Sequence, residues 1–151
     1  ILGIPYGPPM DIWSTALVLI EMLTGDALFP GDDELEVLWM ISQLIGPPPH
    51  ELVNQGNRKD EFFDDESDLK PIQNPRPPKS LNLSDVLKVN DPLLIDFLMK
   101  CLTWDQQDRL TSRQALQHPW IRSREIKVTK QKSNPSMLPT LDASSRRNMC
   151  L

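Results

Sequence analysis

The chain has 151 residues, of which 39% are hydrophobic and 15 are prolines, and its formal net charge is −5 at pH 7. This length favours one modest domain, and Cys101 and Cys150 have neither the number nor the spacing of a disulfide framework or a zinc site. We therefore expect an intracellular protein, cytoplasmic or nuclear. A nucleic-acid role would need a denser basic cluster than Arg146-Arg147.

The first predicted element is a helix at about residues 12–23, entered through Asp11 and closed by Thr24-Gly25. Its apolar side chains point in nearly every direction, whereas a surface helix is apolar on one stripe only. The apolar run is shorter than the roughly 20 residues that span a bilayer. The pattern therefore predicts a buried central helix, with Gly25 as its left-handed end residue.

A second helix is predicted from Glu34 to Ile45. Asp33 and Glu36 have the spacing of a capping box at its start, and Gly46 ends it. Prolines 47–49 then require an extended segment.

Residues 54–80 are predicted to be mainly a Pro-rich insert loop, anchored by the aromatic pair Phe62-Phe63. The acidic stretch Asp64-Asp65-Glu66 is interpreted as a solvated face, and a metal site there is the weaker alternative.

Two more helices complete the expectation. One covers about 92–103, with Asp91 as a cap and Pro92 in the first turn. The other covers 111–117, with Thr111 and Gln114 as a capping box, and ends before Pro119. No strand pattern is long enough to predict a sheet, so the fold class should be all-α.

Charge divides the chain into two parts. Residues 1–121 carry nine Lys/Arg against 19 Asp/Glu, whereas residues 122–151 carry seven against two. The second part has few large apolar residues, so it cannot bury enough surface to order itself. We expect an ordered part at 1–122 and a basic disordered tail at 123–151.

The order and spacing of several short motifs resemble the carboxyl-terminal part of the large lobe of a eukaryotic protein kinase. These motifs are Asp11-x-Trp13-Ser14, Thr24-Gly25, Leu28-Phe29-Pro30-Gly31, Asp108-Arg109-Leu110-Thr111 and Ala115-Leu116-x-His118-Pro119-Trp120. The resemblance runs from residue 1 to about 122.

Within the kinases, the chain is similar to the dual-specificity tyrosine-regulated branch, in the group of cyclin-dependent and mitogen-activated kinases. Ser84-Asp85-Val86-Leu87-Lys88 and the run from Asp91 to Asp105 carry this similarity. Homeodomain-interacting and splicing-factor kinases share parts of it.

The resemblance implies a serine/threonine (tyrosine) kinase that transfers the γ-phosphate of ATP to protein hydroxyls. Phosphoryl transfer needs a glycine-rich loop, a strand lysine, a catalytic aspartate and Mg²⁺ ligands, and none of these motifs occurs in the sequence. We therefore expect an inactive fragment, with no catalytic, ATP-binding or metal-binding residue. ATP, Mg²⁺ and protein substrates would bind the upstream parts of a longer parent, with no membrane or specific nucleic-acid partner. The alternative is a non-catalytic helical interaction module or a pseudokinase fragment.

Three residues take structural roles by the same resemblance. Asp11 resembles the aspartate that accepts hydrogen bonds from backbone N–H groups of the catalytic loop. Trp13 resembles a buried tryptophan that packs beside the activation segment. Arg109 resembles the arginine that pairs with the glutamate of an Ala-Pro-Glu motif, which the sequence lacks. We therefore expect replacement of Arg109 to be nearly silent in this chain. Taken singly, the three are more simply a helix cap, a core residue and a solvated arginine.

Overall fold

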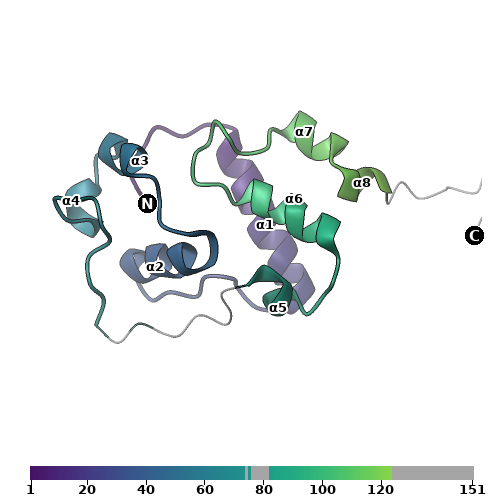
Figure 1. The fold of residues 1–151 in the computed structure, drawn as a ribbon, viewed down its shortest axis with the longest axis horizontal. Helices are drawn as coiled ribbons and strands as arrows, with labels where there is room; N and C mark the ends of the chain where they lie inside the picture. The colour runs from purple at the N-terminus through teal and green to yellow at the C-terminus, as the bar shows by residue number, and fades with distance from the viewer. Residues whose placement is uncertain (74, 76–81, 124–151) are drawn as a thin grey trace, which may run out of the picture.

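The structure is a computed structural model that describes residues 1–73, 75 and 82–123. Within these ranges it contains helices and loops but no β-strand, and one isolated antiparallel bridge joins Phe63 and Leu69. The predicted all-α fold is therefore confirmed. The helices are α1 (Pro9–Thr24), α2 (Glu34–Ile45), α3 (His50–Gln55), α4 (Lys59–Phe62), α5 (Leu83–Leu87), α6 (Pro92–Cys101), α7 (Ser112–Gln117) and α8 (Pro119–Ser123) (Figure 1).

One core cluster lies where α1 crosses α6 and α5 (Figure 1). Ala16 and Ile20 of α1 are fully buried there, because small and branched apolar side chains fill the space against the apolar stripe of α6. Other buried members are Leu83, Leu87, Leu94, Phe97, Leu98, Cys101 and Leu102.

A second cluster joins α2, α3 and α4. Leu38 and Val53 pack with the aromatic pair Phe62-Phe63, which confirms the predicted anchor of the insert. Leu2 and Trp104 are half-buried against this cluster. The amino-terminal segment and the loop after α6 therefore meet on its surface.

The ends of the longer helices follow the predicted signals. Asp33 accepts a hydrogen bond from the Glu36 backbone at 2.8 Å, and Asp91 accepts from two backbone N–H groups at the start of α6. Thr111 and Gln114 form the predicted capping box of α7. Gly25 has φ 80°, a left-handed conformation that glycine adopts without strain.

Some predicted boundaries were wrong. α1 begins at Pro9 rather than at about residue 12, because Pro8 has a right-handed helical conformation and proline suits the first helical position that Pro9 occupies. Asp11 therefore lies within the first turn and does not cap the helix. Short helices α3, α4, α5 and α8 were not predicted; α7 ends before Pro119 as predicted, and α8 begins there.

The predicted burial of α1, expected of a complete domain, is met on one side only in the part of the chain that is described. Its buried residues are Ala16 and Ile20, while Val18 is 54%, Leu23 53% and Met22 77% exposed. The reason is that α5 and α6 cover one side of the helix, and no described element covers the face that carries Val18 and Met22.

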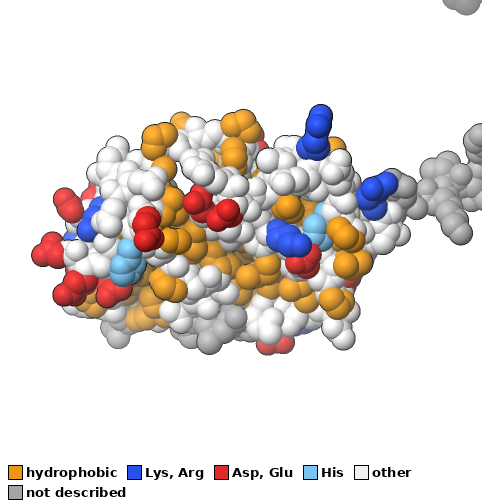
Figure 2. Space-filling view, turned by 45° about the horizontal axis from the view of Figure 1, so that its top comes forward, with side chains coloured by type: hydrophobic (Ala, Val, Ile, Leu, Met, Phe, Trp, Pro, Cys, Tyr) orange, Lys and Arg blue, Asp and Glu red, His pale blue; other side chains and the backbone are white. Residues whose placement is uncertain are grey.

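The surface is divided by chemistry. Figure 2 shows apolar side chains gathered across the middle of one face and acidic side chains at the end that α3 and α4 occupy. No described helix is long and apolar enough to cross a bilayer. Residue 123 of the predicted tail ends α8, and the rest of the tail, with Cys150, lies outside the described residues.

Candidate functional site

Arg109 connects the loop after α6 to the start of α1. A backbone hydrogen bond to Asp105 closes a turn that directs its side chain inward. Nε and Nη2 donate to the Thr103 carbonyl at 2.9 and 2.8 Å, and Nη2 also donates to Trp104 at 3.1 Å. Nη1 donates to the Pro9 carbonyl at 3.0 Å. The guanidinium thus binds backbone from both ends of the described chain.

Two indoles extend this contact. The guanidinium carbon of Arg109 lies 5.0 Å from the Trp13 ring centroid, within the range of a cation–π interaction. The rings of Trp13 and Trp104 are 6.0 Å apart, and the indole N–H of Trp104 donates to the Gly46 carbonyl at 2.8 Å. Arg109, Trp13 and Trp104 therefore form one cluster, which we call the Arg109 cluster.

Burial shapes the electrostatics of this cluster. Loss of solvent lowers the pKa of Arg109, and the charge of Asp105 offsets part of the effect. None of the described ion pairs includes Arg109. The positive charge is therefore held by backbone carbonyls and an aromatic face rather than by a carboxylate.

These bonds change one expectation from the sequence. Replacement of Arg109 was expected to be nearly silent because the glutamate partner is absent, but Arg109 binds three backbone carbonyls inside this chain. Its replacement should therefore destabilise the chain even without a glutamate partner.

Asp11 is not part of the Arg109 cluster. Its side chain is exposed on the first turn of α1, and among the described residues its carboxylate has no hydrogen-bond or ion-pair partner. Its backbone carbonyl accepts from the Thr15 hydroxyl at 2.7 Å. Of the three residues singled out in the sequence, the structure brings together Trp13 and Arg109 only.

A pocket of about 260 Å³ opens beside the Arg109 cluster. Gln106, which was not singled out in the sequence, donates to the Pro5 carbonyl at 3.1 Å and holds the amino-terminal segment as one wall. The lining residues are Ile1, Leu2, Gly3, Ile4, Pro5, Tyr6, Met10, Trp13, Leu38, Ile41, Leu52, Trp104, Gln106 and Arg109.

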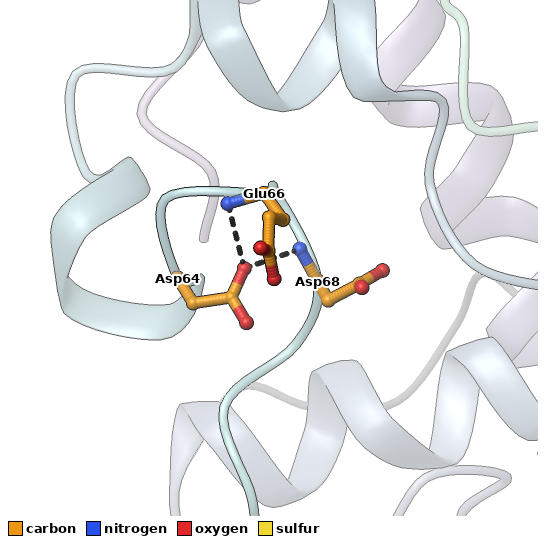
Figure 3. Close-up of side chains that lie close together, drawn as sticks. All are labelled: Asp64, Glu66 and Asp68. Carbon is orange, nitrogen blue, oxygen red and sulfur yellow. Dashed lines mark hydrogen bonds between the residues drawn. The ribbon is translucent and has the colours of Figure 1, made fainter.

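Three exposed carboxylates gather on the insert: Asp64, Glu66 and Asp68 lie with ligand atoms within 4.8 Å of one another (Figure 3). One oxygen of Asp64 accepts from the backbone N–H groups of Glu66 and Asp68, at 3.0 and 2.9 Å. The Asp64 carboxylate therefore stabilises a turn. Asp68, rather than the predicted Asp65, completes it.

The described residues do not fit ATP with Mg²⁺. The pocket is smaller than the roughly 300–1,000 Å³ of typical ligand sites, and its wall contains no carboxylate that could hold a metal ion. The exposed acidic trio lies on a separate loop, and one carboxylate oxygen of Asp64 is already bonded to the backbone of that loop. No step of phosphoryl transfer is assigned to these residues.

Comparison with known proteins gives consistent matches. The model of the protein kinase domain matches residues 1–121. The chain is 39% identical over 129 residues to the DYRK-family kinase pom1 of Schizosaccharomyces pombe, covering 83% of the chain and 12% of that protein. It is 41% identical over 132 residues to human dual specificity tyrosine-phosphorylation-regulated kinase 4, covering 84% of the chain and 25% of that protein. It is 36% identical over 170 residues to human dual specificity tyrosine-phosphorylation-regulated kinase 3, covering 99% of the chain and 27% of that protein. The chain thus spans about a quarter or less of these relatives.

Proposed function

Because this chain belongs to the protein kinase family, we propose that it is the carboxyl part of a dual-specificity-type serine/threonine (tyrosine) kinase. The whole protein would transfer the γ-phosphate of ATP to hydroxyl groups of protein substrates. The observation that carries this proposal is the match of residues 1–121 to the kinase domain, together with relatives of the dual-specificity branch. That branch is the one that the motifs of the sequence resemble.

In this proposal, residues 1–122 act as scaffold, and the residues that bind ATP and Mg²⁺ lie in other parts of the protein. The 151 residues contain no glycine-rich loop, no strand lysine, no catalytic aspartate and no Mg²⁺-binding motif. Protein substrates would bind those other parts as well. We place the protein inside the cell, in the cytoplasm or nucleus, with neither a membrane nor a specific nucleic acid as partner.

Arg109 would pair with the glutamate of an Ala-Pro-Glu motif in the longer protein. Two features support this role: the guanidinium is half-buried, and no described carboxylate lies within ion-pair distance of it. A planar guanidinium suits a bidentate pair with a carboxylate. Trp13, stacked against it, would anchor the neighbouring segment.

Asp11 would accept backbone N–H groups of the catalytic loop. Its exposed carboxylate, which meets no described partner, supports this role. A carboxylate in the first turn of a helix is also favoured by the helix dipole.

A non-catalytic helical interaction module, or part of a pseudokinase, is the second candidate. The uncovered apolar face of α1 favours an interaction role, since exposed apolar patches mark contact surfaces. Both candidates share the fold and differ in what precedes Ile1.

The test is to determine the transcript upstream of Ile1 and to assay both proteins for phosphate transfer. We expect in-frame catalytic motifs, transfer of ³²P from ATP to a basic protein by the longer protein, and none by residues 1–151. An upstream frame without those motifs, or an intact longer protein without transfer activity, would support the second candidate.

A further inference from the structure

The segment of residues 1–3 packs directly on the turn between α3 and α4 (Figure 1). A Cβ atom on Gly3, whose φ is 74°, would overlap the side-chain oxygen of Asn57, and one on Gly56 would overlap the Leu2 carbonyl oxygen. The Asn57 N–H donates to the Gly3 carbonyl at 3.5 Å. Because only glycine leaves room at both crossing points, the two backbones are in close contact.

Arg58 fastens this turn to α2 and α4. Its guanidinium donates to both carboxylate oxygens of Glu34, at the start of α2, at 2.9 and 2.6 Å. It also donates to both oxygens of Glu61, in α4, at 3.0 and 2.7 Å, and to the Ile1 carbonyl at 3.2 Å. The guanidinium carbon lies 4.8 Å from the centroid of the Phe62 ring. Two bidentate pairs orient one guanidinium more strictly than a single charge contact does.

This arrangement differs from an ordinary surface ion pair. The pair of Lys100 and Asp96, with N and O 2.7 Å apart, has similarly exposed partners but joins two positions of α6 only. Arg58 is 32% exposed and joins helices that are 24 positions apart in the sequence. Surface pairs contribute little singly and more as a network. The Arg58 bonds therefore fix a tertiary arrangement, whereas the Lys100 bond supports one helix.

The stretch that leads into α1 is fastened at three points. The turn of residues 56–58 holds residues 1–3, Gln106 bonds the Pro5 carbonyl, and Arg109 bonds the Pro9 carbonyl. In the proposed function, the first turns of α1 contribute Asp11 to the catalytic loop and Trp13 to the neighbouring segment. A displacement of residues 1–3 would therefore reach groups that support catalysis.

We propose that Arg58 is a positioning residue for phosphate transfer: it locks the turn between α3 and α4, and this turn holds the segment that leads into α1. The inference rests on the proposed function, because its effect is on catalysis by the longer kinase. Arg58 acts through the backbone of residues 1–3 and touches neither ATP nor the protein substrate. The insert thereby takes part in catalysis from a distance.

The test uses the longer kinase, with kcat and the KM for ATP measured on a basic protein as phosphate acceptor. Arg58→Gln should lower kcat about tenfold, since misplacement of a catalytic group by about 1 Å can cost about 100-fold. The KM for ATP should stay unchanged, because the ATP-binding parts are not altered. Lys100→Gln is the matched control: it also removes an exposed ion pair, and it should leave kcat unchanged. Thermal unfolding checks that each variant is folded at the assay temperature.

Glu34→Gln is the milder second variant. It leaves Arg58 its bonds to Glu61, so it should lower kcat less than Arg58→Gln does. Combining the two substitutions should lower kcat no further than Arg58→Gln alone, because both act through one pair.

Hydrogen exchange gives a second readout that needs no activity. In the longer kinase, the amides of residues 56–58 should exchange faster in Arg58→Gln than in the natural protein, because the Asn57 N–H loses its fixed position against the Gly3 carbonyl. Lys100→Gln should leave their exchange unchanged.

Unchanged exchange at residues 56–58 in Arg58→Gln would overturn the proposal, as would equal kcat values for Arg58→Gln and Lys100→Gln. Additive losses in the double variant would overturn it too. These outcomes leave the proposed function intact if the natural protein transfers phosphate. A natural longer protein that transfers none would overturn both.

Discussion

The guanidinium of Arg109 stacks on the ring of Trp13 at 5.0 Å while it donates to the Pro9 carbonyl one turn earlier on the same helix. A residue near the end of the described chain is thereby joined to α1 by two contacts of different kinds. This relationship makes the loop after α6 a structural part of the amino-terminal half.

Arg109→Ala should destabilise the chain by about 1–3 kcal/mol, because it removes the side-chain donor of the Thr103 and Trp104 carbonyls and the bond that joins this loop to Pro9. In the longer kinase the loss should rise to about 3–5 kcal/mol, since a buried glutamate would also lose its partner. Equilibrium urea unfolding of both proteins measures the difference.

Arg113→Ala is the matched control. Arg113 lies exposed on α7, so its replacement should change the free energy of unfolding by no more than about 0.5 kcal/mol. Equal losses for Arg109→Ala in the two proteins would count against a glutamate partner.

Trp104→Phe should cost about 1–2 kcal/mol. The change keeps an aromatic ring against Trp13 but removes the N–H that bonds the Gly46 carbonyl at 2.8 Å. Trp39→Phe is the comparison, because the Trp39 indole makes no hydrogen bond among the described residues. Thermal unfolding followed by circular dichroism should show the larger loss for Trp104→Phe. The reverse order would mean that the bond to Gly46 contributes little.

Asp96 should make stability depend on acid pH. Its carboxylate accepts from Lys100 at 2.7 Å and contacts His118 at 2.9 Å, and these partners, Lys100 first, hold the pKa of Asp96 below its usual value of about 3.9. A carboxyl group whose pKa is lower in the folded state stabilises the fold at pH values above its unfolded-state pKa. This stabilisation is lost as the pH falls through its folded-state pKa.

The free energy of unfolding should therefore fall more steeply below about pH 4 in the natural chain than in Asp96→Asn. Urea unfolding at a series of pH values between about 2 and 7 measures both slopes. Parallel slopes would show that the contacts of Asp96 add no stability.

The uncovered face of α1 should make the chain self-associate or aggregate. Val18→Glu combined with Met22→Lys should shift sedimentation toward the monomer, since both side chains are exposed and the new pair has favourable helical spacing. Ile20→Glu, at a fully buried position, should instead unfold the chain. A monodisperse, cooperatively folding natural chain would contradict this expectation.

Local signals predicted the longer helices well. α2 has the predicted bounds because Asp33 caps it and Gly46, at φ 83°, ends it. The caps of α6 and α7 act within four residues, so the sequence contains them in full.

Features that depend on distant contacts were not predictable in this way. α3 has six residues, too few to be stable alone, and the burial of Leu52 and Val53 maintains it. α7 ends before Pro119 as predicted, but Pro119 also occupies the first position of α8, which was not predicted. The pocket depends on Gln106 reaching Pro5, a contact that no local pattern encodes.

That contact and the bond from Arg109 to Pro9 have a consequence during protein synthesis. The segment of residues 1–9 is made before the side chains that fasten it, which come about 100 positions later. At translation rates of about 5–20 residues per second, the segment waits about 5–20 s on the ribosome before it can be fastened. During that interval Leu2 and Ile4 have only the nascent chain or a chaperone to cover them.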